Sequence, residues 1–287
     1  MTGSAPQLES LVHALDVARL PDGTFLGPPT ERALPRLFGG YVLAQTVMAA
    51  GRTVASGRHL HSLHALFLRG GDSTVPVTYE VVELRDGRSF SARAVSALQG
   101  GAVLATVQLS FALPQTGLDH QCFEAGRIPA PQALPPLGER LRLELDSLPS
   151  WWAAPHPFDI RFVEHPEALA AGGVRDPQQA YWVRAAGTVP DEPLLHAALL
   201  AYVSDLTLLD PSLMPHGRSW YGNRVISGAS LDHAMWFHRP PSLNNWLLCR
   251  QSSPIATSGR ALCECTYTTE AGHRIASATQ EGLLREP

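Results

Sequence analysis

The segment GASLDHAMWFHRP, residues 228–240, holds the densest set of side chains in this chain that could do chemistry. It carries a hydroxyl at Ser230, a carboxylate at Asp232 and an imidazole at His233. These three cannot form a hydrolase triad by themselves, because such triads are assembled from residues far apart in sequence. In an extended strand, Ser230 and Asp232 share one face and His233 points to the other. The segment also lacks the G-x-S-x-G motif, so we expect a strand with only part of its polar set in catalysis.

The bulk composition is that of an ordinary globular protein, with 45% hydrophobic residues, 17% charged residues and a net charge of −4 over 287 residues. The negative charge argues against a nucleic acid or an anionic membrane surface as the main partner. All 22 basic residues are arginine, which excludes a lysine Schiff base and leaves phosphate binding to arginine. The N-terminal segment does not resemble a signal peptide, and no apolar run approaches the roughly 18 residues that cross a bilayer.

The cysteine pattern predicts reduced thiols rather than disulfides or a metal centre. None of the cysteines belongs to a C-x-x-C pair, and no zinc-type arrangement surrounds them; they are Cys122, Cys249, Cys263 and Cys265. We therefore expect a cytoplasmic protein without a metal ion or another cofactor.

The order of elements predicts two similar halves. The apolar segment from Phe38 to Val54 has the length and composition of a buried helix, and EPLLHAALLAYVSDLTLL in the second half has the same character. Strand-like runs follow each helix. A proline-rich stretch divides the halves, so we predict one domain over residues 1–112, a connector over 113–157 and a second domain over 158–287 that carries the catalytic residues.

Short segments of similar sequence in the two halves support a duplicated domain; HALFLR resembles HAMWFHR, and LATVQLSF resembles IASATQEGL. These similarities align Ser62 with Ser230 and Gln108 with Gln280. A long helix wrapped by a curved antiparallel sheet, present twice, is the arrangement that this order favours.

Six segments in this order resemble the type II acyl-CoA thioesterases, the TesB-like family: FGGYVLAQ, LHSLHALFLRGGD, LRDGRSFSAR, YVSDLTLL, SLDHAMWFHRP and ASATQEGLLR. The resemblance extends from about Phe38 to Arg285. It implies an α+β double hotdog fold, with two tandem hotdog domains that each wrap a curved antiparallel sheet around a long helix. It further implies hydrolysis of fatty acyl-CoA by an activated water without an acyl-enzyme, a role in fatty acid metabolism, and a homo-oligomer.

The resemblance places the catalytic roles on Asp205 of YVSD, on Ser230 and on Gln280 of ATQEG. Many relatives have threonine where this chain has Ser230, and the change keeps the hydroxyl. Because a thiol pKa is only about 8.5, the thiolate of a thioester leaves readily. The remaining tasks are to deprotonate and aim a water and to stabilise an oxyanion, and a carboxylate held beside a hydroxyl and an amide suits them.

Four further residues are expected near the site. Asp232 and His233 support it through hydrogen bonds rather than by chemistry. Arg88 and Arg260 each lie beside a turn glycine at equivalent places of the repeat, and both are candidates for the phosphates of CoA. It is equally consistent with the sequence that both are solvent-exposed hairpin arginines without a role in binding. The helix residues Val42, Leu43 and Val47 either wall an acyl tunnel or belong to the core.

The repeat predicts one active site per chain. In the first helix, the residue that best matches Asp205 is Gln45, and an amide cannot act as a base. Two other functions stay open. One is a catalytically silent acyl-CoA-binding or regulatory protein, against which the retained trio argues. The other is a hydratase or dehydratase that uses His196, although Asp205 lies nine residues along the same helix and faces elsewhere.

Overall fold

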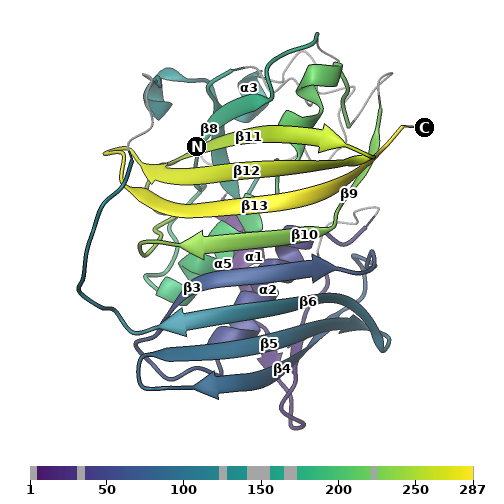
Figure 1. Cartoon of the computed structure of the whole chain (residues 1–287). Coiled ribbons are helices and arrows are strands. Elements are labelled where there is room, and N and C mark those ends of the chain that lie inside the picture. Colours follow the sequence, from purple (N-terminus) through teal and green to yellow (C-terminus); the bar gives the residue numbers. More distant parts are fainter. Residues whose placement is uncertain are drawn as a thin grey trace.

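The computed structural model describes residues 5–30, 36–122, 128–140, 156–164, 173–220 and 225–286. These residues form one 13-stranded sheet in the order β1-β2-β4-β5-β6-β3-β10-β13-β12-β11-β8-β7, with β9 paired to β13 (Figure 1). All the pairs between named strands are antiparallel.

The first half contributes two helices and six strands. They are α1 (Ala5–Ala14), β1 (Ala18–Arg19), β2 (Phe25–Gly27), α2 (Gly39–Gly51), β3 (His59–Phe67), β4 (Val77–Asp86), β5 (Phe90–Gln99) and β6 (Ala102–Ala112). Helix α2 coincides with the apolar segment in which a buried helix was predicted, and its residues from Gly40 to Ala50 are buried. Val42, Leu43 and Val47 pack in the main hydrophobic core.

The second half repeats this order. Its elements are β7 (Phe158–Phe162), β8 (Gln178–Ala185), α5 (Pro193–Ser204), the 3-10 helices η3 (Asp210–Ser212) and η4 (Met214–His216), β9 (Ser227–Ser230), β10 (Asp232–Phe237), β11 (Leu247–Thr257), β12 (Arg260–Thr269) and β13 (Arg274–Arg285). The predicted second helix therefore ends at Ser204, and the residues after it continue in short 3-10 turns.

The two halves join at the centre of the sheet, where β3 pairs with β10. In Figure 1 the strands lie in front and the long helices α2 and α5 lie behind them. The helices are antiparallel and in close contact, because a Cβ on Gly40 would lie 2.5 Å from the Tyr202 carbonyl and one on Gly51 would meet Leu194. Each half is thus a curved antiparallel sheet around one long helix, which confirms the predicted double hotdog fold.

The chain between β6 and β7 crosses from one half to the other. Gln121 donates to the Gly272 carbonyl at 2.7 Å, and Arg239 pairs with Asp119 at 2.8 Å. Beyond these contacts its described part forms η1 (Pro131–Ala133) and α3 (Leu137–Arg140). Residues 123–127 and 141–155 of the predicted connector lie outside the described residues. None of the helices in the described ranges is long and apolar enough to cross a membrane.

Candidate functional site

The structure brings Asp205, Ser230 and Gln280 into direct contact. Gln280 Nε2 donates to Asp205 Oδ1 at 2.8 Å and also to Ser230 Oγ, and the Ser230 hydroxyl donates to the same Asp205 oxygen at 3.3 Å. The three residues come from the end of α5, from β9 and from β13. All of these hydrogen bonds direct their protons toward the carboxylate or toward the hydroxyl beside it, which favours an ionised Asp205.

Asp205 lies where the two long helices meet. It is the C-cap residue of α5, and its carboxylate accepts the backbone N–H of Gly40 at the start of α2. A Cβ on Gly39 would lie only 2.7 Å from Asp205 Oδ2, so the glycine pair allows this approach. The N-terminus of α2 has no side-chain cap of its own, and an anion there is stabilised by the helix dipole.

Burial nevertheless decides the acidity of this carboxyl. Desolvation raises the pKa of Asp205 from 3.8 to about 6, while the hydrogen bonds from Gln280, Gly40 and Ser230 oppose the rise. A carboxylate with a pKa slightly below neutral pH is ionised there and still basic enough to take a proton from water.

Asp232 and His233 contact the site from the next strand. Asp232 Oδ1 accepts the backbone N–H of Glu281 at 2.7 Å, which ties β10 to β13 beside Gln280. His233 is fully buried; its Nδ1 lies 3.4 Å from Gln280 Oε1 and its Nε2 lies 2.9 Å from Ser204 Oγ. The pKa of His233 is lowered to about 4 by burial, so the ring is neutral.

The expectation that Ser230 and His233 point to opposite faces is wrong. Ser230 is opposite Gly282 and Ala234 is opposite Thr279, so three residues on one strand face two on the other. The extra residue makes a bulge between β9 and β10, and a bulge reverses the alternation of side chains. Ser230 and His233 therefore both reach Gln280.

Strand pairing also corrects the alignment of the two halves. The central pair of the β3–β10 ladder is His64 opposite Ala234, so an approximate twofold axis relates these two residues. One residue back, Leu63 therefore corresponds to His233. Leu63 is opposite Leu109, and continuation of the β10–β13 pairing places His233 opposite Gln280.

The counterpart of Gln280 is thus Leu109, and the predicted match with Gln108 is wrong by one residue. Because side chains alternate along a strand, this slip matters: Gln108 is exposed, whereas Gln280 is buried. The same correction applies to Ser230. Leu60 is opposite Phe111 with a bulge after it, as Ser230 is opposite Gly282, so Leu60 is its counterpart and Ser62 is not.

Gln45 does not correspond to Asp205 either. It lies in the middle of α2, where Nε2 donates to the Ala14 carbonyl at 2.8 Å and Oε1 accepts the Tyr79 hydroxyl at 2.6 Å. The residue that caps the end of α2, as Asp205 caps α5, is Arg52. The first half therefore lacks a carboxylate at this helix end, which agrees with a single site per chain.

Neither candidate arginine has a hydrogen bond to a member of the trio in the described part of the chain; Arg260 begins β12 after the β11–β12 turn, and Arg88 lies in the β4–β5 turn. Arg260 is exposed and its Nε donates to Glu281 at 2.9 Å, next to Gln280 in the chain. Arg88 is exposed in the β4–β5 turn, and its backbone carbonyl accepts a hydrogen bond from Arg58. His196, the residue of the dehydratase alternative, is buried and its Nδ1 accepts the Leu243 backbone N–H at 3.2 Å, so this nitrogen already has a partner outside the trio.

Sequence reasoning did not assign roles to Ser204, Gly39 and Gly40. Their signals were present as the serine beside Asp205 and as the glycine pair at the start of the first helix. Only the packing of α2 against α5 shows that the glycines face Asp205.

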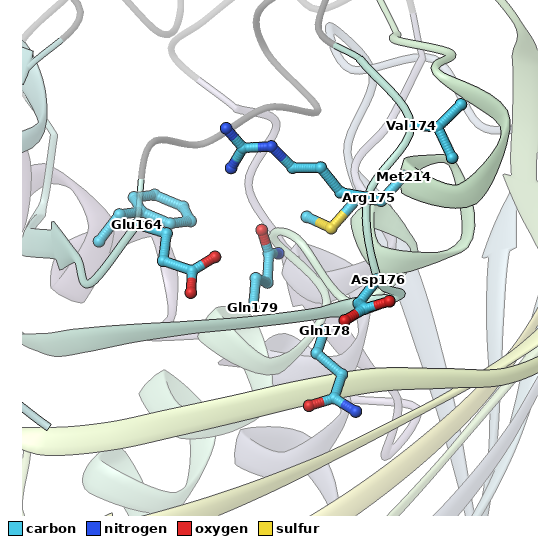
Figure 2. A pocket seen from close by; sticks show the side chains of 8 residues that line it. Glu164, Val174, Arg175, Asp176, Gln178, Gln179 and Met214 are labelled. Carbon is cyan, nitrogen blue, oxygen red and sulfur yellow. The ribbon is translucent and has the colours of Figure 1, made fainter. Parts of the chain in front are cut away.

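A cavity of about 470 Å³ lies in the second half, but no member of the trio lines it. Figure 2 shows Gln179 in this cavity between Glu164 and Met214. Gln179 Nε2 donates to Gln251 Oε1 at 2.6 Å and to the carbonyl of Thr207, in the loop that follows Asp205, at 3.3 Å. Within the described parts of the chain, no group of His, Cys, Asp and Glu side chains could hold a metal ion.

Comparison with known proteins identifies relatives over almost the whole chain. Residues 28–112 match the family model of the acyl-CoA thioesterase N-terminal domain, and residues 155–283 match that of acyl-CoA thioesterase. The chain is 34% identical to acyl-CoA thioesterase 2 of Haemophilus influenzae over 97% of its own length and 98% of that protein's. It is 36% identical to acyl-coenzyme A thioesterase 8 of Rattus norvegicus, with 87% and 80% covered.

A solved structure of similar sequence supports the same relationship. The crystal structure of an acyl-CoA thioesterase II from Mycobacterium marinum superimposes with a TM-score of 0.78 at 37% identity, covering 98% of each chain.

Proposed function

The chain belongs to the type II acyl-CoA thioesterase family and is an acyl-CoA thioester hydrolase, and we propose that it uses Asp205, Ser230 and Gln280 to activate a water molecule. The observation that carries this proposal is the convergence of the three side chains on one carboxylate oxygen. A silent acyl-CoA-binding protein would not need a carboxylate, a hydroxyl and an amide held in mutual contact at one place.

In the proposed reaction, Asp205 removes a proton from a water molecule as the water oxygen attacks the thioester carbon. The carbon–sulfur bond then breaks, and the CoA thiolate takes up the proton that Asp205 removed from water, which gives free thiol and carboxylic acid and returns Asp205 to its ionised form. Ser230 and Gln280 keep the carboxylate in one orientation through their hydrogen bonds. The positive end of α2, at Gly39 and Gly40, adjoins the same place and would stabilise the negative charge that develops on the carbonyl oxygen.

We propose that exposed arginines bind the phosphates of CoA. Arg88 and Arg260 are exposed on equivalent hairpins, and guanidinium groups suit the phosphates of CoA. The Arg260–Glu281 pair would have to open or turn for this contact. We propose that the acyl group is a fatty acyl chain. We also propose the cytoplasm as the compartment, because cysteines stay reduced there and the four cysteines of this chain are all free.

We further propose a homo-oligomer. Large apolar side chains are exposed on the sheet, with Leu66 at 56% and Trp236 at 36% exposure near its centre. Apolar groups in such a position are typical of protein contacts. Light scattering of the purified protein at several concentrations tests this part.

The experiment that tests the function is release of free CoA from acyl-CoA substrates of short to long chain, followed with a thiol-reactive dye. We expect continuous release by the wild-type protein and strongly reduced release by Asp205→Asn. Binding of acyl-CoA without release in the wild type would instead support the silent alternative.

A further inference from the structure

The end of strand β3 lies beside the carboxylate of Asp205, which is half-buried. A Cβ on Gly39 would lie 2.7 Å from Asp205 Oδ2 and 3.1 Å from the ring of Phe67, the last residue of β3. The Phe67 backbone N–H donates to the Leu231 carbonyl at 2.9 Å, next to Ser230. The residues that follow Phe67 are exposed, so this segment leads from the reacting groups to the surface.

Two exposed arginines, Arg36 and Arg69, lie on the surface next to this end of β3. Arg69 belongs to the segment that leaves β3, and Arg36 belongs to the segment that enters α2 at Gly39. A Cβ on Gly70 would lie only 3.5 Å from Arg36 Cδ. The side chain of Arg36 therefore lies over the residue that follows Arg69, and the two positive charges are neighbours.

The position of Arg69 is fixed by the strand beside it. The backbone N–H groups of Leu68 and Arg69 both donate to the Leu104 carbonyl, at 2.7 and 3.2 Å. The Arg69 side chain donates from Nη1 to the Val103 carbonyl at 3.0 Å. A guanidinium carries five N–H groups, and no other one of Arg69 has a partner among the described residues, so the rest can bind a ligand.

Neither Arg36 nor Arg69 forms an ion pair within the described part of the chain. Asp72, the acidic residue that follows Arg69 in the sequence, accepts the N–H and the hydroxyl of Thr74 at 2.8 and 2.7 Å. Seven other arginines do pair with a carboxylate: Arg52, Arg93, Arg161, Arg184, Arg218, Arg239 and Arg260. Two neighbouring guanidinium groups without a carboxylate partner are suited to receive an anion.

We propose that Arg36 and Arg69 bind phosphate groups of CoA while the thioester lies at Asp205. The long pantetheine arm of CoA joins the thioester to the phosphates, and it would follow the segment from Phe67 to Arg69 outward. Guanidinium groups bind phosphate oxygens through paired hydrogen bonds. The inference rests on the proposed function and adds two residues to the hairpin arginines proposed for the same ligand.

A pair of substrates separates this role from a general role in the fold. Acyl-CoA and the S-acyl-N-acetylcysteamine with the same acyl group present the same thioester to Asp205, but only acyl-CoA carries phosphates. We expect Arg36→Gln combined with Arg69→Gln to raise KM for acyl-CoA about 10-fold with kcat nearly unchanged. The kcat/KM for the N-acetylcysteamine thioester should stay within about twofold of wild type.

Single variants and a matched control sharpen the comparison. Arg36→Gln and Arg69→Gln should each give part of the rise in KM, and Arg36→Lys and Arg69→Lys should give less of it, because lysine keeps the charge but not the forked geometry. Arg19→Gln is the control. Arg19 is also exposed, but it lies on the edge strand β1, with four strands between it and β3, so KM should not change.

Calorimetric titration with free CoA measures the same contact without turnover. We expect the double variant to bind CoA about 10-fold more weakly than wild type, and the difference to shrink with added salt, which screens exposed charges. Weakened CoA binding in the double variant together with an active Asp205→Asn protein would refute the proposed function and leave this inference standing.

The proposal is overturned if the double variant keeps the wild-type KM for acyl-CoA and the wild-type affinity for CoA. It is also overturned if the double variant, or either single glutamine variant, loses the same factor of kcat/KM on both substrates. The single variants decide the question if the double variant does not fold, which circular dichroism and thermal unfolding monitor.

Discussion

Strands β3 and β6 of the first half and strands β10 and β13 of the second are paired in the same way, with one extra residue at His61 and at Leu231. On the inner face of the first half, three leucines fill the equivalent positions with at most 6% exposure: Leu60, Leu63 and Leu109. The second half has Ser230, His233 and Gln280 there. The same arrangement of strands thus carries apolar core side chains in the first half and the polar side chains of the candidate site in the second half.

The comparison shows how the work is divided between the halves. The second half supplies the carboxylate and its hydrogen-bond partners, which replace apolar contacts by polar ones. The first half supplies the N-terminus of α2, where Gly39 and Gly40 meet Asp205. Neither half would form the site alone, because the carboxylate and the helix end come from different halves.

Asp205→Asn should have the largest effect, since it removes the one carboxylate that distinguishes the halves at their helix ends. We expect kcat to fall at least about 100-fold with KM changed little, because general-base catalysis contributes roughly 10²–10⁴-fold. Steady-state release of CoA measures it. Retention of more than a tenth of the activity would refute the assignment.

Mirror substitutions at Gln280 and Leu109 should separate function from stability. Gln280→Leu is expected to lower kcat about 10-fold to 100-fold while the protein stays as stable as wild type or becomes more so. Leu109→Gln is expected to keep the activity of the folded protein and to cost about 2–5 kcal/mol of unfolding free energy, because it buries an amide in the core. Urea denaturation and CoA release on both variants test the pair. Equal losses of activity would contradict the division between the halves.

Substitutions at Ser230 distinguish attack by water from attack by serine. If Ser230 only helps to hold Asp205 and water, Ser230→Ala keeps measurable activity and Ser230→Thr is nearly neutral, because the hydroxyl survives. Among the described residues, Asp205 is the one base in hydrogen-bond contact with Ser230, and the proposed mechanism assigns that base to the water molecule; a serine without a base of its own is a poor nucleophile. Intact-protein mass spectrometry after rapid quench with acyl-CoA is decisive, and an acyl adduct on Ser230 would overturn attack by water.

The second half buries another carboxyl, that of Asp210, and its ionisation should make the stability of the protein depend on pH. Its Oδ1 accepts the Trp220 indole N–H at 2.8 Å, and burial raises the pKa of Asp210 from 3.8 to about 7. A raised carboxyl pKa means that the folded state holds the proton more tightly than the unfolded state does. Ionisation of Asp210 therefore opposes folding increasingly as pH rises from about 4 to 7.

Asp210→Asn should accordingly gain stability relative to wild type at pH 8 and show little of this gain at pH 4. Urea denaturation at both pH values measures the difference. A gain of equal size at the two values would show that the carboxyl does not titrate in this range.

Asp232→Asn should have the smallest effect. The Asn carbonyl can still accept the Glu281 N–H that Asp232 binds, so we expect a loss of about 1 kcal/mol of stability and near wild-type kcat. Thermal unfolding and CoA release measure the two. A folded Asp232→Asn protein without activity would show that Asp232 is the catalytic aspartate and Asp205 is not.

The sequence by itself determined the fold and the relationship to the family, because both depend on many residues spread along the chain. The two buried helices are visible as apolar segments, the strands as runs around turn residues, and the ordered motifs point to Asp205, Ser230 and Gln280 before any contact is known. The assignment of a helix, a strand or a family motif remains correct when its position is wrong by one or two residues.

Only the tertiary structure decided which residues share a face. A slip of one residue moves a strand side chain to the opposite side, and the similar segments HALFLR and HAMWFHR conceal such a slip, since exposed His64 corresponds to Ala234 and buried His233 to Leu63. The bulge at Leu231 and the meeting of Gly40 with Asp205 depend on strand pairing and helix packing between distant segments. Local sequence patterns do not record such long-range geometry.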